Sequence, residues 1–540
     1  MAKSYRPVDR DQVFLLPPDM REWLPGGHPV FVVIEALGLL DTSAFHALRR
    51  TGGAGAAGYD PDMLLGVLVW AYAHKESSSR RMEELCRTDV AFRVICAGNL
   101  PDHSTIARFR KDFGEAVPGF FAQVLILCAR LGMGRLGTVA LDGTKIAASA
   151  SKAANRGEEK LRELAERAVA AHAAADAAED ELYGAGRRGD ELAAEERPGS
   201  WSPRRRRERI GEALAQLEAE RRAAEQEGEA KAAEFRARQR AGQRTGPAPA
   251  GAAVALAEEN LARVRAAREA QLAELREQRA GRARGGRLAG VQDYCRVREA
   301  AAKVERARER QAQAQAKAAA KAGPGPVRNV TDPDSRLMPT RNGFIQGYNA
   351  QNVTSEDGLV IATRLTDDTT DMAWFAPMAE QAQRAAALIE ANRPAGHDDG
   401  DAPGSGGIEL VLADAGYCSE ENLTCPGPDR LIAVGKRRDL EKAARDSGPA
   451  GQEQDWGGPA VQAMRERLRT EDGIAAYRQR GHIAETPHGH IKHNMGLRQL
   501  SMRGKDKAAA EWAFTCAVHN LLKALTAGHL TPAALAGLAG

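Results

Sequence analysis

The run TVALDG at residues 138–143 decides the fold, together with its counterpart IELVLAD at residues 408–414. Each run is short, apolar and β-prone, which favours a buried strand, and each leads into an acidic residue, Asp142 or Asp414. Two paired strands, a helix, a short strand and C-terminal helices are expected at 343–353, 359–366, 371–392, 431–434 and from about 462 onward. This order predicts an α/β fold, a mixed sheet flanked by helices, with one carboxylate at the end of each of two strands.

Helical segments precede and interrupt this sheet. Apolar residues recur at helical spacing before it, with Asp60 and Ser104 as expected helix caps, so residues 1–131 are predicted to be an all-helical N-terminal domain. Residues 152–326 are dominated by Ala, Glu, Arg, Lys and Gln, which favour long exposed helices. We predict a helical hairpin or coiled-coil insertion there, partly disordered. Its breaks are expected at 197–203, 241–251 and 281–290.

The bulk composition narrows the class of protein. A chain of 540 residues suggests two or three domains. The net charge of +3 does not by itself single out a nucleic-acid binder, so the distribution of charge matters more. Seven cysteines without a CxxC pair argue against a disulfide scaffold or a zinc ribbon and suit a reducing cytoplasm. The N-terminus lacks a signal-peptide pattern, and no apolar stretch approaches membrane-spanning length, so we expect a soluble cytoplasmic protein without a membrane partner.

Three acidic residues form a candidate catalytic set: Asp142, Asp414 and Glu485. Cutting a phosphodiester needs an activated attacking oxygen and a neutralised leaving oxygen, which two Mg²⁺ ions held by a few carboxylates supply. Taken singly, each aspartate is better explained as a turn former or helix cap, and Glu485 as a helix-surface residue. Other acidic residues compete for the same role, namely Asp332, Asp334, Asp367, Asp368 and Asp371.

Five motifs give these residues a specific context. They are the helical stretch 59–113, which begins YDPDMLLGVLVWAY, then LDGTKIAASAS at 141–151, DPDSRLMPTRNGFIQGYNAQNVTSEDGLVIA at 332–362, LADAGYCSEENL at 412–423 and YRQRGHIAETPHGHIKHNMGLRQLSMRG at 477–504. In this order they resemble the insertion-sequence transposases of the eleven-eighty-two group, within the DDE transposases. The resemblance covers most of the chain except the insertion at 152–326.

The resemblance implies an RNase H-like catalytic domain, formed by residues 132–151 and 327–530. It implies that Asp142, Asp414 and Glu485 bind Mg²⁺ (or Mn²⁺) and carry out catalysis. Lys492, seven residues after Glu485, would lie on the same helix face and hold a DNA phosphate.

Tyr477 and Arg480 match the start of a signature found in related families, Tyr, Arg, Glu, Lys, and are further candidates for DNA binding. The sequence departs from that signature because four residues rather than three separate Arg480 from Glu485. Pro487 also lies within the expected helix, where it would bend the helix or mark its first turn.

The implied function is DNA transposition: cleavage at the ends of an insertion sequence, then strand transfer into target DNA. The partners would be double-stranded DNA, as terminal repeats and target, and further copies of this chain assembled on that DNA in a bacterial cytoplasm. The alternatives are a decayed, non-catalytic DNA-binding copy and a host RNase H-like nuclease. The helical N-terminal domain argues against the nuclease, which has less need of a module that reads DNA ends.

Two further groups have open interpretations. Arg108, Arg110 and Lys111 follow a capped helix that would enter a DNA groove as in helix-turn-helix domains, although a solvated helix face explains them equally well. Four histidines surround Glu485, and a solvated, DNA-facing surface explains them better than a transition-metal site. They are His482, His488, His490 and His493.

Overall fold

The computed structural model describes residues 19–48, 58–167, 203–243, 248–249, 252–279, 289–321, 326–394, 407–435 and 458–539. The chain divides into two compact units. One comprises residues 1–154 and 331–540, and the other residues 155–330.

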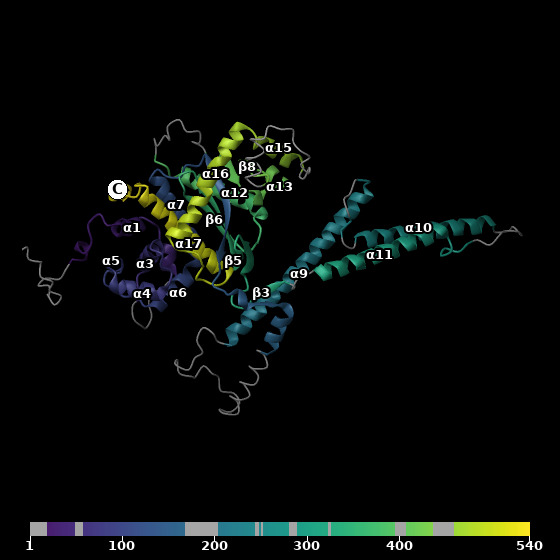
Figure 1. Cartoon of the computed structure of the whole chain (residues 1–540), viewed down its shortest axis with the longest axis horizontal. Helices are drawn as coiled ribbons and strands as arrows, with labels where there is room; N and C mark the ends of the chain where they lie inside the picture. Colours follow the sequence, from purple (N-terminus) through teal and green to yellow (C-terminus); the bar gives the residue numbers. More distant parts are fainter. Residues whose placement is uncertain are drawn as a thin grey trace, which may run out of the picture. The chain divides into compact units, whose positions relative to one another are not determined.

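A mixed sheet is the centre of the first unit (Figure 1), which confirms the predicted fold class. Its central strand is β1 (Thr138–Ala147), which pairs antiparallel with β5 (Gly343–Ser355) and parallel with β7 (Leu410–Ala413). Strands β4 (Arg336–Thr340) and β6 (Val360–Thr366) pair with β5, and β8 (Asp429–Ile432) pairs with β7.

The length of β1 corrects the sequence prediction. Its pairing with β7 stops at Leu141 and Ala413, whereas its pairing with β5 continues to Ala147 and Gly347. Asp142 is therefore not at the end of a strand. It is the first residue of β1 beyond the end of β7, where β1 has lost its neighbour on one side.

Helices cover both faces of the sheet. Side chains of β5 alternate between the two faces. On one face, Asn352 contacts Trp512 of α17 (Lys505–Thr526). On the other, Gln351 contacts Asp371, which precedes η5 (Met372–Trp374) and α12 (Phe375–Glu390). Helix α16 (Glu471–Gly489) lies against β1, β5 and β7. Shorter elements complete the sheet-bearing part: η3 (Lys152–Ala154), η6 (Ala415–Tyr417), α13 (Glu420–Thr424), α15 (Pro459–Arg467), η7 (His490–Asn494) and α18 (Pro532–Ala539).

The described part of the N-terminal region is all-helical, as predicted. Its elements are η1 (Met20–Glu22), α1 (Pro29–Gly38), α2 (Ser43–Ala47), α3 (Pro61–Ala73), α4 (Ser79–Thr88), α5 (Val90–Ile95), α6 (His103–Asp112), η2 (Phe113–Glu115) and α7 (Val117–Arg130). Asp60 caps α3 as expected. The cap predicted at Ser104 is wrong, because the Asp102 carboxylate accepts from the backbone N–H groups of Ser104 and Thr105 and starts α6 earlier.

The N-terminal helices share one apolar core with the sheet-bearing part. The ring of Phe514 on α17 packs against those of Tyr72, Phe113 and Phe120, with centroids 5.3–5.6 Å apart. No single helix among the described residues is long and apolar enough to cross a membrane, although the bent pair His103–Glu115 and Val117–Arg130 passes by length and composition.

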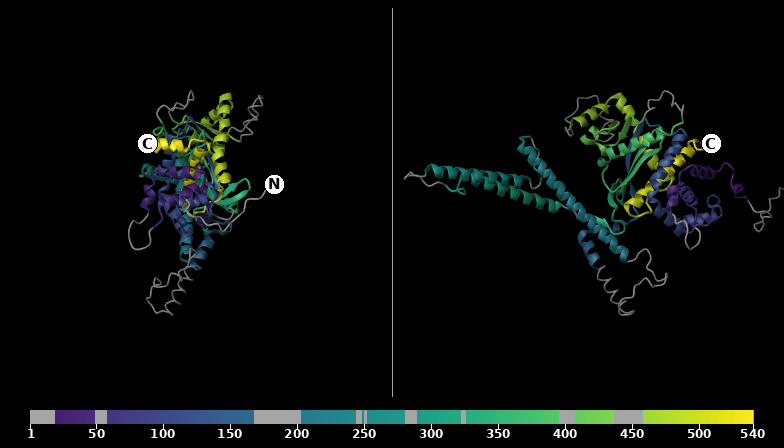
Figure 2. Two further views of the ribbon diagram at one scale, coloured as in Figure 1. Left: turned by 90° about the vertical axis from the view of Figure 1, so that its left-hand side faces the viewer. Right: turned by 180° about the vertical axis from the view of Figure 1, so that it is seen from behind.

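The second unit is helical, as the composition predicted. It contains one antiparallel strand pair, β2 (Asn155–Gly157) with β3 (Val327–Asn329). Its long helices are α9 (Pro203–Arg240), α10 (Ala252–Arg279) and α11 (Cys295–Lys321). Helices α10 and α11 lie side by side as a hairpin (Figures 1 and 2). The predicted break at 241–251 separates α9 from α10, whereas the breaks at 197–203 and 281–290 and the predicted disorder fall largely outside the described residues.

Candidate active site

Two of the three predicted carboxylates meet where β7 ends. Asp142 lies on β1 just beyond the last residue paired with β7, and Asp414 directly follows β7. One guanidinium nitrogen, Nη2 of Arg480, lies 2.8 Å from Oδ1 of Asp142 and 3.7 Å from Oδ2 of Asp414. The parallel pairing of strands 272 residues apart in the sequence therefore places both aspartates beside one cation.

Asp142 is the more buried of the two aspartates, with a side chain 16% exposed against 42% for Asp414. Burial raises the pKa of Asp142 to about 6, because it disfavours the charged form. The Arg480 guanidinium opposes this shift and the negative charge of Asp414 adds to it. The site therefore holds two carboxylates under mutual repulsion with one arginine between them.

Asp414 combines two roles. Its Oδ1 accepts from the backbone N–H of Gly416 at 2.9 Å, so it caps the 3-10 turn η6, as the turn interpretation of the sequence expected. Its other carboxylate oxygen faces Arg480. The cap fixes the side chain and leaves one oxygen free for the site.

Helix α16 supplies the cationic side of the site. Thr470 caps this helix, which then carries Tyr477 and Arg480 against the sheet. The hydroxyl of Tyr477 donates to the carbonyl of Ala413 at 3.2 Å and so ties the helix to the end of β7. Burial would lower the pKa of Arg480, but the charges of Asp142, Asp414 and Glu485 raise it on balance.

Glu485 stands apart from the aspartate pair. It is exposed on α16, and no hydrogen bond or ion pair among the described residues joins it to either aspartate. Its charge nevertheless acts on Arg480, as do the charges of Asp142 and Asp414. The charges of all three predicted carboxylates thus raise the pKa of Arg480, although only the two aspartates have a short contact with it.

Lys492 lies differently from the simple helical expectation. Helix α16 runs through Pro487 and ends at Gly489, and one π-helical turn, η7, follows, so Glu485 and Lys492 are not two regular turns apart. The ammonium of Lys492 donates to Thr144 Oγ1 and, at 2.9 Å, to the carbonyl of Lys145. Burial lowers the pKa of Lys492. These two hydrogen bonds tie Lys492 to the part of β1 that extends beyond β7.

The histidine cluster is only partly on the surface. His482 and His493 are exposed, but His488 is 7% exposed, so a solvated surface is wrong for that residue. Its Nε2 lies 3.9 Å from Oδ2 of Asp142, and neither ring nitrogen makes a hydrogen bond of normal geometry. Burial lowers the pKa of His488 to about 3, so the ring is neutral at physiological pH.

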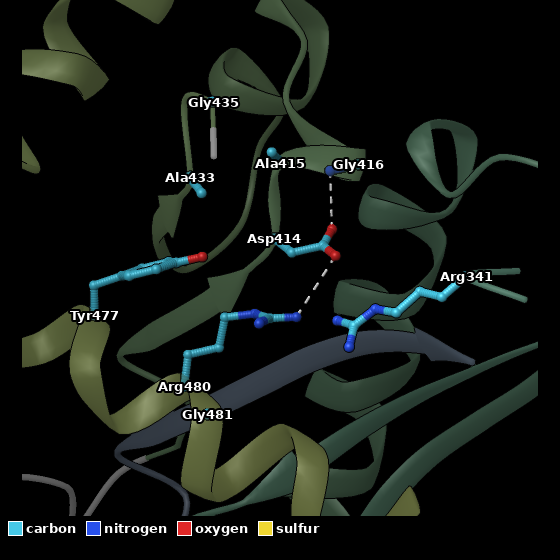
Figure 3. Close-up of a pocket in the computed structure, with 9 residues that line it drawn as sticks. All are labelled: Arg341, Asp414, Ala415, Gly416, Ala433, Gly435, Tyr477, Arg480 and Gly481. Atoms are coloured by element: carbon cyan, nitrogen blue, oxygen red, sulfur yellow. Dashed lines mark hydrogen bonds and ion pairs between the residues drawn. The ribbon is translucent and has the colours of Figure 1, made fainter. Parts of the chain in front are cut away.

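A cavity of about 500 Å³ opens beside Asp414 (Figure 3). Its lining includes Tyr477 and Arg480 from α16 and Arg341 from the turn between β4 and β5. The guanidinium of Arg341 points toward Asp414 from the side opposite Tyr477 (Figure 3). Sequence reasoning missed Arg341, because nothing in its local pattern places a hairpin tip beside a residue far along the chain.

The basic group on α6 separates into two kinds of residue. Arg108 and Lys111 are exposed. Arg110 is 8% exposed, and its guanidinium donates to the Ser77 carbonyl and lies 3.4 Å from the hydroxyl of Tyr72. The interpretation of Arg110 as part of a solvated helix face is therefore wrong. Because its guanidinium donates to groups inside the protein, we do not propose Arg110 as a DNA contact.

The aspartate pair suits a hard divalent cation. Mg²⁺ binds through one or two carboxylates plus water and substrate oxygens, which is what Asp142 and the free oxygen of Asp414 offer. Both ring nitrogens of His488, one of them 3.9 Å from Asp142, are buried without a hydrogen-bond partner among the described residues, so this position has polar capacity to spare. Among the described residues, the ligand atoms of the site do not form a preassembled group. The one such group found in the described part of the chain lies elsewhere, in the N-terminal helical region, and consists of His46, Asp60 and Asp62.

Two family models match the chain. One, described as a transposase domain, matches residues 18–112, and one, described as a transposase DDE domain, matches residues 453–525. These two matches identify a transposase domain in the N-terminal part of the chain and a transposase DDE domain near its C-terminus. The second match contains the α16 residues of the transposase site, while Asp142 and Asp414 lie outside both matches. No curated protein and no solved structure matches this transposase chain, and its place in the eleven-eighty-two group remains a prediction.

Proposed function

We propose that this chain catalyses DNA cleavage at the ends of an insertion sequence, followed by strand transfer into target DNA. The observation that carries the proposal is the meeting of Asp142 and Asp414 at the end of β7, with one nitrogen of Arg480 beside both. Aspartates on two adjacent strands with a buried arginine between them are an arrangement for a phosphodiester and its metal ions.

In this proposal Asp142 and Asp414 would hold Mg²⁺ (or Mn²⁺), and Glu485 would complete the set from α16. When bound, the cation neutralises phosphate charge, polarises the phosphodiester and makes a bound water a better nucleophile. Water attacks the phosphorus at the element's end, and the 3′ oxygen leaves as a free 3′-hydroxyl. That hydroxyl then attacks a phosphodiester of the target DNA and displaces the 3′ oxygen of the target strand.

The chain's other residues position the substrate and shape the site. Arg480 and Arg341 flank the cavity beside Asp414, so both can donate to phosphate oxygens. Tyr477 fixes the register of α16 against β7. Lys492 holds the open edge of β1 through its bond to the Lys145 carbonyl, and its contribution to DNA binding would require release of that bond.

The sheet supports an RNase H-like assignment for this domain. In this six-stranded sheet β4 and β6 both pair with β5. Neighbours in the series β6, β5, β1 pair antiparallel, and neighbours in the series β1, β7, β8 pair parallel. The N-terminal helices, with Arg108 and Lys111 exposed on α6, are proposed to read the terminal repeats. Assembly of several copies on DNA in a bacterial cytoplasm belongs to the same proposal.

The test is end cleavage by the full chain on DNA that carries the repeats flanking its gene. Asp142→Asn and Asp414→Asn should each abolish Mg²⁺-dependent cleavage while leaving end binding intact. Asp368→Asn is the matched control, because that carboxylate instead accepts from the indole N–H of Trp374 and should leave cleavage unchanged. Full cleavage by the Asp142 variant would refute the assignment. Binding without cleavage by the wild-type chain would favour a decayed copy, and cleavage indifferent to the repeats would favour a nuclease.

A further inference from the structure

A fourth carboxylate, Asp371, lies beside the proposed site. The sequence suggested it only as one of several competing acidic residues. It immediately precedes η5, between β6 and α12, and its side chain is 21% exposed. Because Gly143 and Asp142 are neighbours on β1, their side-chain positions lie on opposite faces of the sheet. Asp371 approaches the Gly143 face, opposite the face where Arg480 meets Asp142.

One oxygen of Asp371 is fixed by three donors. Its Oδ1 accepts from the side-chain amides of Asn349 at 2.6 Å and Gln351 at 2.7 Å, and the ammonium of Lys145 lies 3.4 Å away. Its Oδ2 makes no hydrogen bond or ion pair with any described residue. A carboxylate held in this way has one oxygen anchored and the other available to a ligand.

The available oxygen faces the space beside Asp414. A Cβ added at Gly416 would lie 3.0 Å from Oδ1 of Asp414 and 3.3 Å from Oδ2 of Asp371, so the two carboxylates border the same small volume. A Cβ at Gly143 would lie 2.6 Å from Oδ1 of Asp371. The charge of Asp371 also contributes to the raised pKa values of Asp142 and Tyr417. Glycine at both positions therefore allows the carboxylates to approach.

A second, independent feature points to a ligand here. Asn349 is fully buried, and its side-chain oxygen has no hydrogen-bond partner. Native proteins rarely leave a buried amide oxygen unpaired, because its desolvation is then uncompensated. This oxygen belongs to the amide whose nitrogen donates to Oδ1 of Asp371, so an amide with an unused hard oxygen contacts the carboxylate that has an available one. Amide and carboxylate oxygens are the atoms that Mg²⁺ and its bound waters prefer.

We propose that Asp371 is a metal ligand that, with Asp414, holds a divalent cation on the Gly143 face of β1. This inference rests on the proposed function, because it assigns a further residue to the metal site proposed there. In this arrangement Asp414 lies between two faces: Asp142 and Arg480 on one, Asp371 and Asn349 on the other. Asn349, Gln351 and Lys145 are then positioning residues that fix Asp371 for coordination.

The direct test is Mn²⁺ binding by the full chain, followed by electron paramagnetic resonance of the free ion. Asp371→Asn should weaken Mn²⁺ binding at one site at least tenfold, in the range known for altered metal-site shells. Asp368→Asn, three residues away, should bind Mn²⁺ as the wild type does. If Asp371→Asn also binds normally while Asp142→Asn and Asp414→Asn do not, Asp371 is not a ligand and the proposed function stands. If none of these variants affects Mn²⁺ binding, or the wild type binds none, the metal site itself is wrong and this inference fails with it.

A second measurement separates ligation from positioning. Asp371→Cys places a thiolate at the proposed ligand position, and thiolates prefer soft cations. Adding Cd²⁺ to Asp371→Cys should produce the ultraviolet absorption of a cadmium–thiolate bond, beyond the signal of Asp368→Cys, which reports the chain's own cysteines. Equal spectra from the two variants would overturn direct coordination by residue 371.

Discussion

Replacing Glu511 should loosen the packing of the N-terminal helices against the sheet-bearing part. Glu511 is fully buried on α17, and its two oxygens accept four hydrogen bonds. Oε1 accepts from the hydroxyls of Tyr72 at 2.7 Å and Ser501 at 2.6 Å. Oε2 accepts from the backbone N–H groups of Ser501 at 2.8 Å and Met502 at 2.9 Å. Tyr72 belongs to α3, so this carboxylate joins the two parts.

The expected magnitude follows from what each substitution leaves unpaired. In Glu511→Gln the amide oxygen can still accept from the two backbone N–H groups while the amide NH₂ donates to the two hydroxyls. The loss is mainly that of charge assistance, about 2 kcal/mol in all. Glu511→Ala leaves both backbone N–H groups buried without acceptors, at about 1–3 kcal/mol each, and adds a cavity. We expect a loss of about 4–5 kcal/mol for that variant.

The assay is urea unfolding followed by tryptophan fluorescence, since the buried Trp512 adjoins Glu511. Glu380→Gln is the matched control: this exposed glutamate on α12 pairs with Arg384 within the helix, and its loss should cost under about 0.5 kcal/mol. Glu511→Ala within about 1 kcal/mol of wild type would refute the reasoning. So would Glu511→Gln that is as damaging as Glu511→Ala, because the amide should satisfy the same partners.

Three further changes test other parts of the structure. Burial lowers the pKa of His519 to about 4 in the folded state, so the unfolded chain takes up a proton first as pH falls. About 3 kcal/mol of stability that is present at neutral pH should therefore be lost between pH 6.5 and 4. The urea midpoint of His519→Gln should depend less on pH than that of the wild type. Asp102→Ala removes the cap of α6 and should lower the urea midpoint in the same assay, whereas Asp102→Asn should largely preserve it. Gly347→Ala would place a Cβ 2.1 Å from the Ile146 carbonyl and should prevent stable folding, whereas Gly119→Ala, on α7 with open space around it, should keep or slightly raise the melting temperature.

Local pattern was enough to predict much of the fold. The apolar runs before Asp142 and Asp414 predicted two buried strands, and the Asp60-Pro61 pair predicted the start of α3. These features depend on neighbours in sequence: period-two or period-3.6 burial, and a side chain that caps the next turn. The helical character of 152–326 followed from composition for the same reason.

Other features depended on partners far away in sequence. The strand β1 runs to Ala147 because β5, some 200 residues later, pairs with it, and this places Asp142 within a strand rather than at its end. Partners distant in sequence also explain why the interpretation of Arg110 was wrong. Its guanidinium donates to Tyr72 on α3 and to Ser77 in the following loop, and these hydrogen bonds allow a charged side chain to be buried.

The sequence by itself determined the elements, their order and the three carboxylates on which the catalytic hypothesis rests. Only the tertiary structure decided that Asp142 and Asp414 share Arg480, that Glu485 stands apart from them, and that Asp371 and Arg341 approach from other elements. The physical reason is that hydrophobic periodicity encodes which face of an element is buried. Which charged side chains then meet depends on strand register and helix packing, which are set by long-range pairing.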